Sequence, residues 1–314
     1  MPEKSSTTHN SITTKQMKDA IQKSGYLLEQ RVEPILSEEG YIVQTNPAFP
    51  DPETGKSREI DINALSATQV YKGDYNFVFP ILLCECENNA QPIVFFTKES
   101  IISFLYHREV KVSGIPIKFW EGNKCISLSE FTAMKEFHHY CKDITATQYC
   151  TFQLTKDKSS WIALHSEEQH DTFNSLIKAL EYEIAQHFDS YYLPNKGENE
   201  TVNIQIYYPL VILQGGLYSA SLENNRLTLR RSNHIQFRRE LFLQSTNEVE
   251  TYQIDVICEE YLRDYLKIID AEMKKIKKVF QRKRQKVNLA INKIVEEVNG
   301  LKEKPESYRE YLEF

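Results

Sequence analysis

The chain has 314 residues, of which 41% are hydrophobic and 26% are charged, and its formal net charge is −6. These values fit a soluble globular protein with about two domains. The longest apolar run, residues 77–84, is far shorter than the roughly 20 residues that cross a bilayer. A membrane-spanning helix is therefore excluded there, and we expect no membrane partner.

The N-terminal residues and the cysteines indicate the compartment. The opening stretch, MPEKSSTTHNSITTKQ, lacks the apolar centre of a signal peptide. The six cysteines show neither metal-ligand nor disulfide spacing. We therefore expect a cytoplasmic protein with reduced thiols, and a disordered polar tail over residues 1–14.

Residues 15–150 are predicted to form one α/β domain. Apolar residues at helical spacing predict a helix over 15–37, and Gly40 follows it as a stop signal. Runs rich in apolar and β-branched residues predict strands at 41–49, 59–67, 77–87 and 115–120. Of these, 77–87 is expected to be the central strand. A helix is expected over 124–140.

Residues 151–257 are predicted to form a second α+β domain. It begins with an amphipathic helix over 170–192 and continues with strands at 202–213, 215–222, 226–232, 234–243 and 251–259. The fold class expected for the whole chain is α/β: a mixed central sheet flanked by helices, a second α+β region, and a long C-terminal helix.

The last region, residues 258–314, is predicted to hold one long amphipathic and basic helix over about 259–299, followed by a tail. Its apolar stripe repeats every three or four residues and needs a partner. That partner is either the second domain or another copy of the chain. We expect a homodimer through this helix or through the second domain.

Basic residues are concentrated in two segments despite the negative net charge. Residues 226–239 carry five arginines and no acid, and residues 274–286 carry eight lysines or arginines among thirteen. Such segregation predicts binding to a polyanion such as DNA, although a solvated surface would have the same composition. The candidate nucleic-acid-binding residues are Arg230, Arg231, Arg238, Arg239, Lys274, Lys275, Lys277, Lys278, Arg282 and Arg284.

Two glutamates end the predicted central strand. Glu85 and Glu87 are two residues apart, so on an extended chain they point to the same face of the sheet. Placing two carboxylates together at the end of a buried strand is costly unless a positive charge lies near them. A metal ion, a basic side chain or water could supply the compensation.

The order of these acids resembles that of a known nuclease family. A glutamate on the first helix, a strand carrying Glu-Ile-Asp, and an apolar strand ending in Glu-Cys-Glu-Asn-Asn resemble the PD-(D/E)xK superfamily, most closely its Mrr-type restriction enzymes and Holliday-junction resolvases. The resemblance covers roughly residues 15–130. It implies a restriction-endonuclease-like fold in which Asp61 and Glu85 bind Mg²⁺ or Mn²⁺, and Glu29 assists through the metal or its waters.

The family's lysine position holds Glu87 in this chain. Some restriction endonucleases of the superfamily carry a second glutamate there, and Glu87 is then a candidate general base. One interpretation is therefore a magnesium-dependent endonuclease acting on DNA in restriction or antiphage defence. The alternative is a catalytically degenerate nuclease fold that serves as a DNA-binding or oligomeric interaction subunit. In a third, the carboxylates are structural and pair with Arg58 or Lys98.

A second possible metal site is formed by His138, His139 and Cys141. These residues are expected to lie in a helix, and no second Cys/His pair follows at zinc-finger spacing. The pattern therefore favours a structural role over a zinc site.

Overall fold

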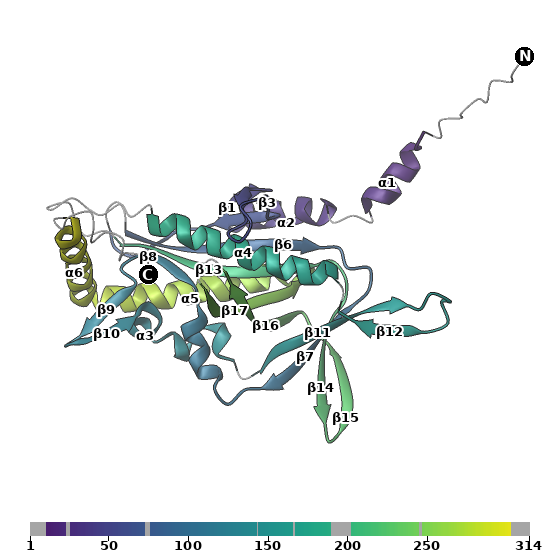
Figure 1. The fold of residues 1–314 in the computed structure, drawn as a ribbon. Helices are drawn as coiled ribbons and strands as arrows, with labels where there is room; N and C mark the ends of the chain where they lie inside the picture. The colour runs from purple at the N-terminus through teal and green to yellow at the C-terminus, as the bar shows by residue number, and fades with distance from the viewer. Residues whose placement is uncertain are drawn as a thin grey trace, which may run out of the picture.

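The computed structural model describes residues 11–22, 26–72, 76–142, 144–165, 167–189, 202–244 and 247–302. Within these residues, one large mixed sheet forms the centre of the molecule, and helices cover both of its faces (Figure 1). The predicted α/β class, with a mixed central sheet flanked by helices and a C-terminal helical region, is confirmed.

The sheet contains 13 strands among the described residues. Its main path runs through β1 (Ile42–Thr45), β4 (Ile62–Leu65), β6 (Asn76–Glu87), β13 (Val202–Leu213), β17 (Glu248–Cys258), β16 (His234–Leu243), β11 (Ile144–Leu154), β7 (Ile93–Glu99), β14 (Leu217–Glu223) and β15 (Arg226–Arg231). Three short strands lie off this path: β5 (Thr68–Gln69) pairs with β6, β8 (Val112–Ile115) with β13, and β12 (Trp161–Leu164) with β11. Two separate ribbons pair β2 (Ala48–Pro50) with β3 (Ser57–Glu59), and β9 (Lys118–Glu121) with β10 (Lys124–Ser127).

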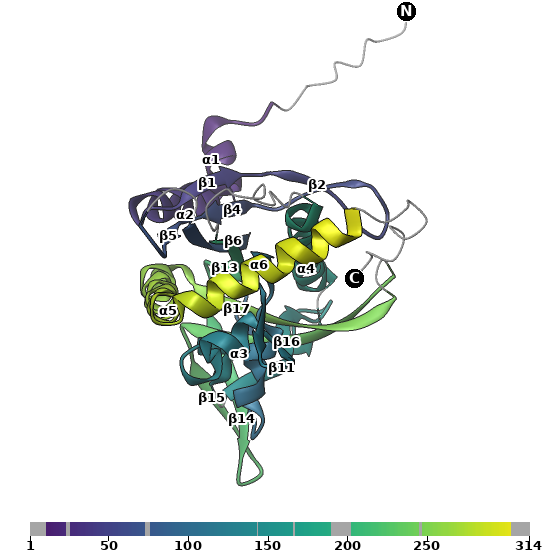
Figure 2. The ribbon, with the colours of Figure 1, turned by 90° about the vertical axis from the view of Figure 1, so that its left-hand side faces the viewer.

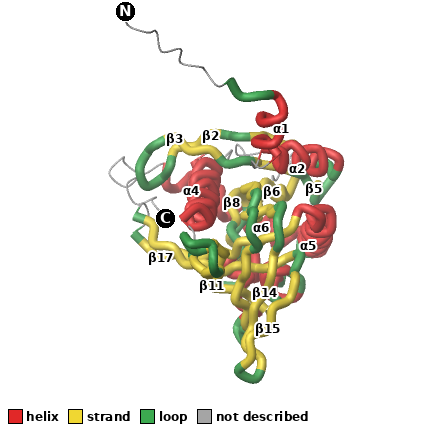
Figure 3. The backbone as a smooth tube through the Cα atoms, turned by 90° about the vertical axis from the view of Figure 1, so that its right-hand side faces the viewer, coloured by secondary structure: helices red, strands yellow, loops and turns green. Residues whose placement is uncertain are grey.

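Helices pack on opposite faces of this sheet. The described helices are α1 (Thr14–Gln22), which buries none of its residues, and α2 (Tyr26–Glu38), α3 (Leu128–Thr132), α4 (Glu167–Asp189), α5 (Leu262–Arg282) and α6 (Arg284–Lys302). Figures 2 and 3 show α4 on one side of β6 and α5 on the other. None of the described helices combines the length and the apolar character needed to cross a bilayer.

The alternation of side chains along β6 builds two separate cores. Leu82 and Cys84 belong to the core under α2 and α5, whereas Ile81 and Leu83 belong to the core under α4. A strand buried on both faces has apolar residues at nearly every position, as the sequence of β6 does. Glu85 continues the series of Ile81 and Leu83, so its side chain lies on the α4 face.

The N-terminal helix differs from the prediction. The expected single helix over 15–37 is divided into α1 and α2. Gly40, with φ of +85°, follows α2 as expected, because this conformation suits a residue without Cβ. Of the predicted disordered tail over 1–14, residues 1–10 lie outside the described residues, and Thr14 already begins α1.

The region between the two predicted domains also differs. The strand expected at 115–120 is divided between β8 and β9, and the helix expected over 124–140 consists of β10, the short α3 and two 3₁₀ turns. Ala133 ends α3 in the left-handed conformation, with φ of 58°. Strands β7, β11 and β12 were not predicted from the sequence.

The long C-terminal helix is interrupted at Lys283, which separates α5 from α6 (φ −104°, ψ 25°). Its apolar stripe, including Leu266, Ile269 and Ile276, is buried in the core beneath the sheet of the same chain. The stripe is therefore covered without a second copy. The homodimer stays a prediction that this helix no longer supports.

The expected division at residue 150 has no counterpart in the sheet. Residue 150 lies inside β11. Strand β13, from the predicted second domain, pairs in parallel with β6 along its whole length. Strands from both predicted domains therefore share one sheet.

Candidate active site

Asp61 and Glu85 come together where β4 and β6 meet. The two strands are antiparallel with Ile62 opposite Cys84, and the same register extended by one residue sets Asp61 beside Glu85. The two carboxyl groups share a hydrogen bond. The backbone N–H of Cys86 donates to Oδ2 of Asp61 over 2.7 Å. The two acids predicted from the sequence as metal ligands are thus in direct contact.

The surroundings of this pair disfavour two negative charges. Burial raises the pKa of Glu85 well above its ordinary value, and the charges of Asp61 and Glu87 raise it further. Burial likewise raises the pKa of Asp61, although the Cys86 amide opposes the shift. A proton or a cation is needed to hold the two groups together.

Helix α4 supplies hydroxyl groups to both glutamates of β6. Thr172 donates a hydrogen bond to Oε1 of Glu87. Ser175 lies one turn further along the helix and hydrogen-bonds Glu85. Residues three apart lie on one side of a helix, so a single side of α4 faces the carboxylates.

Glu29 lies close enough to Asp61 for the charge of Asp61 to act on it, and it belongs to α2, the second part of the helix predicted over 15–37. It is buried on α2, and Nδ2 of Asn46 donates to its Oε2 over 3.4 Å. Burial and the charge of Asp61 raise its pKa. Among the described residues, however, neither Glu29 nor Glu87 joins Asp61 and Glu85 in a three-ligand group within 4.8 Å.

The basic partners expected for a purely structural role are engaged elsewhere. Arg58 and Lys178 both pair with Asp51, with Lys178 Nζ 2.9 Å from Oδ2. Lys98 lines a groove of about 1290 Å³ beside the β14–β15 hairpin, which extends from the body of the molecule (Figure 1). The charges that act most strongly on Glu85 are those of Asp61 and Glu87, and both raise its pKa.

Several of the predicted nucleic-acid-binding residues are neutralised within the chain. Arg230 pairs with Glu223, Arg231 with Glu260, and Lys274 with Asp270. Arg238 pairs with Glu109 and Glu240. Pairing of this kind reduces the charge that an arginine offers to a phosphate.

The remaining predicted residues lie over aromatic rings or are exposed or half-buried on their elements. Lys275 and Arg284 lie over the rings of Phe137 and Tyr71, at 5.2 and 4.8 Å from the ring centres. Lys278 and Arg282 are exposed on α5, Lys277 is half-buried there, and Arg239 is half-buried on β16. The structure therefore brings Asp61 and Glu85 into contact, with Glu87 and Glu29 near them but outside a three-ligand group, whereas the basic residues are spread over several elements.

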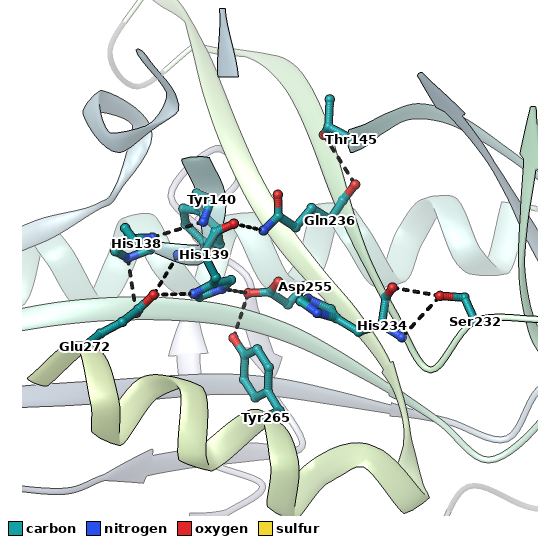
Figure 4. A network of polar contacts seen from close by, with 10 residues as sticks. All are labelled: His138, His139, Tyr140, Thr145, Ser232, His234, Gln236, Asp255, Tyr265 and Glu272. Carbon is teal, nitrogen blue, oxygen red and sulfur yellow. Dashed lines mark hydrogen bonds and ion pairs between the residues drawn. The ribbon is translucent and has the colours of Figure 1, made fainter. Parts of the chain in front are cut away.

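A second polar cluster, which was not predicted from the sequence, is centred on His139 and lies between the sheet and α5 (Figure 4). Its Nε2 lies 2.9 Å from Oδ2 of Asp255 on β17, and its Nδ1 lies 2.8 Å from Oε1 of Glu272 on α5. All three side chains are almost fully buried. His234 and Tyr265 also bond Asp255, each over 2.6 Å.

The charges of this cluster stabilise one another. Burial alone would lower the pKa of His139, but Asp255 and Glu272 outweigh it and raise the value to about 10. Burial raises the pKa of Glu272, whereas His138 and His139 lower it to about 2. The protonated imidazole thus links the central sheet to α5.

His138, His139 and Glu272 could hold a metal ion, because each offers one ligand atom and these atoms lie within 4.8 Å of one another. Two imidazoles and one carboxylate suit transition metals rather than Mg²⁺, which prefers oxygen ligands. This group is therefore not the predicted magnesium site. Since both His139 nitrogens face carboxylates, a metal would have to displace a proton from that ring.

Two of the three residues in this possible metal site could be recognised in the sequence. His138 and His139 stood out as a pair, but the third member comes from α5 rather than from Cys141. The pair lies at a 3₁₀ turn over His139–Cys141 instead of the expected helix. Ligands contributed by elements so far apart along the chain have no spacing that sequence analysis recognises.

No family model, no curated protein and no solved structure matches this chain.

Proposed function

We propose that this protein is a metal-dependent nuclease that hydrolyses phosphodiester bonds in DNA, with Mg²⁺ or Mn²⁺ bound by Asp61 and Glu85. One observation supports this above all: two partly buried acids, Asp61 just before β4 and Glu85 near the end of β6, are in contact, burial raises the pKa of both, and the charge of Asp61 raises that of Glu85 further. A pair arranged in this way favours a cation.

The donor set fits the proposed cofactor. Mg²⁺ binds through one or two carboxylates and keeps several of its waters, so a pair of acids is sufficient. A hard cation at this position would activate water and neutralise charge on phosphate oxygens. Asp61 and Glu85 would hold it, with Glu29 acting on their surroundings.

Glu87 takes the part of general base in this proposal. It lies on the same face of β6 as Glu85, and the Thr172 hydroxyl orients its carboxylate. A carboxylate fixed in this way can accept a proton from the attacking water. The proposal thereby accounts for a glutamate in the position where the resembled family has lysine.

A restriction-endonuclease-like fold and a role in restriction or antiphage defence are parts of the same proposal. They are supported by the order in which successive elements carry the acids. Glu29 lies on α2, Asp61 precedes β4, and Glu85 and Glu87 end β6. This order agrees with the resemblance described above.

The proposal is tested by incubating the protein with supercoiled plasmid in Mg²⁺, in Mn²⁺ and in EDTA. Cleavage is expected with either metal and not in EDTA, and Glu85→Gln or Asp61→Asn should abolish it. Glu181→Gln is a matched control, because Glu181 is also a half-buried acid with a pKa raised by burial, but it accepts a hydrogen bond from Tyr252 instead. This control should cut like the wild type.

One observation favours the alternative of a degenerate nuclease fold. Asp61 and Glu85 have no third ligand within 4.8 Å among the described residues, and the lysine position is held by Glu87. In that case the wild type would bind DNA in either metal without cutting it.

A further inference from the structure

The side chains of two adjacent arginines on β16, Arg238 and Arg239, point to opposite faces of the sheet. Ile235 and Phe237 pack into the core under α4, and Arg239 continues their series, so it lies on the α4 face. Glu85 and Glu87 lie on this same face. Arg238 lies on the other one.

Carboxylates surround Arg238. Its guanidinium bonds Glu109 over 3.0 Å and Glu240 over 3.3 Å, and it lies over the ring of Tyr106. Its charge is therefore compensated by the protein itself.

Arg239 has only neutral partners. Its Nη2 donates to Oδ1 of Asn174 over 2.9 Å and lies 3.0 Å from Nε2 of His170, both on α4. Among the side chains that the structure describes, which do not include those of residues 166–169, no carboxylate pairs with this half-buried guanidinium. An arginine desolvated without a counter-charge is unfavourable, so the site lacks an anion.

Hydrogen-bond donors outnumber acceptors around Arg239. His170 faces a donor at each ring nitrogen, namely Arg239 at Nε2 and the Asn174 amide at Nδ1, over 3.0 Å in both cases. A neutral imidazole can accept at only one of its nitrogens. Nearby, the Tyr149 side chain is 3% exposed and its hydroxyl oxygen faces the Arg239 guanidinium, but its own O–H has no acceptor within hydrogen-bond distance. An oxyanion would supply the missing acceptors.

The first turns of α4 connect these residues to the carboxylates. Thr172 and Ser175 face Glu87 and Glu85, whereas His170 and Asn174 face Arg239. Strand β16 lies three strands away from β6, so Arg239 and the carboxylates are separated by about 14 Å across the sheet at about 4.8 Å per strand. This is roughly four nucleotides along one DNA strand at about 3.4 Å each.

We propose that Arg239, Asn174, His170 and Tyr149, called here the Arg239 cluster, bind a backbone phosphate of the DNA strand whose scissile bond lies at Asp61 and Glu85. This inference rests on the proposed nuclease function and specifies how that site holds its substrate. The ligand chemistry is a phosphate oxyanion, from DNA or from free inorganic phosphate.

The first test compares Arg239→Gln with Arg238→Gln as a matched control on the opposite face. Binding of fluorescein-labelled duplex DNA is followed by anisotropy in EDTA, at salt concentrations from about 50 to 200 mM. Arg239→Gln should weaken binding about tenfold and flatten the log–log salt slope by about 0.9, the share of one phosphate contact. Arg238→Gln should keep the wild-type slope. Equal slopes for Arg239→Gln and the wild type would overturn the inference.

The second test uses Asn174→Asp, which keeps Arg239 in place. Its result therefore holds even if the Arg239→Gln protein does not fold. It gives Arg239 the carboxylate that it lacks, so it should raise the melting temperature while weakening DNA binding to the level of Arg239→Gln. Wild-type affinity in a folded Asn174→Asp protein would contradict the inference.

Two further measurements distinguish the ligand source and the two proposals. Inorganic phosphate alone should raise the melting temperature of the wild type but not of Asn174→Asp, whereas DNA should bind far more tightly than phosphate. Similar affinities would mean that the cluster binds free phosphate and not DNA.

Cleavage with wild-type KM in Arg239→Gln would overturn the Arg239 inference alone. Arg239-dependent binding without cleavage would overturn the nuclease proposal alone.

Discussion

Asp61 meets Glu85 across the antiparallel pair of β4 and β6, and the backbone amide of Cys86 donates to the same aspartate. An amide donor stabilises the charged form of Asp61, whereas burial destabilises the charged form of both acids. The strand register has therefore created a place where a cation relieves an existing repulsion. Several variants test this directly.

Glu85→Gln should separate the effect of Glu85 on the stability of the metal-free protein from its role in binding the metal. Removing one charge from a repelling pair should leave the metal-free protein as stable as the wild type or slightly more stable. A metal at a hundredfold excess over its dissociation constant stabilises a binding protein by about 2.7 kcal/mol. Urea denaturation with and without Mn²⁺ should show this gain in the wild type and none in the variant. A variant less stable than the metal-free wild type would indicate a structural role for Glu85.

Glu87→Lys restores the residue that the resembled family has at this position. The lysine would face the acidic Glu85 and could donate to the Thr172 hydroxyl, so we expect a higher melting temperature than in the wild type. Loss of the general base should slow cleavage by about 10²- to 10⁴-fold. Single-turnover cleavage measures this loss. A variant that cuts at the wild-type rate would show that Glu87 is not the base.

Asp51 should make stability depend on pH. Burial would raise the pKa of Asp51, but hydrogen bonds from Lys178, the Glu53 amide and Arg58 outweigh it and hold that pKa well below its usual range. A lowered folded-state pKa contributes stability that is present above the unfolded value of about 3.9 and is lost as pH falls below it.

Denaturation of Asp51→Asn should reveal this contribution. The variant should be less stable than the wild type at pH 7 by about 1.5–3 kcal/mol, the usual value of hydrogen bonds to a charged group. The difference should shrink steadily below about pH 4. A difference that stays constant down to pH 2 would contradict the assignment.

Asp255→Asn tests the buried histidine cluster. The substitution leaves the His139 charge with Glu272 as its principal counter-charge, and breaking a buried ion pair on one side costs about 3–5 kcal/mol. Asp270→Asn is the control, because Asp270 is an exposed acid whose partner is Lys274. It should change the free energy of unfolding by less than about 0.5 kcal/mol. Equal effects of the two substitutions would mean that the cluster is not ionised.

Strong periodicity made the central elements predictable. The apolar run of β6, the stripe of α4 and the strands from β13 to β17 lie close to where the sequence predicts them. Asp61 and Glu85 were also predictable as neighbours, because each adjoins a strand that can be recognised and the two strands pair directly.

The histidine cluster could not be predicted, for a physical reason. His139 bonds Asp255 at a separation of 116 residues and Glu272 at a separation of 133. The contacts depend on how β17, α5 and a 3₁₀ turn pack, and no local spacing encodes that packing. The pairing of the basic residues could not be predicted for the same reason, because Arg238 is neutralised by Glu109, 129 residues away along the chain.

The pairing of β6 with β13 has a consequence for synthesis of the protein. Asn76 and Val202 begin this parallel ladder, 126 residues apart along the chain. Translation adds about 5–20 residues per second, so β6 waits roughly 6–25 seconds for its neighbour. Helix α4, which carries Thr172 and Ser175, is made late in the same interval. A nascent or truncated chain therefore holds its acidic residues without the scaffold that orients them. The nuclease proposed above would therefore become able to cut only when most of its chain has left the ribosome.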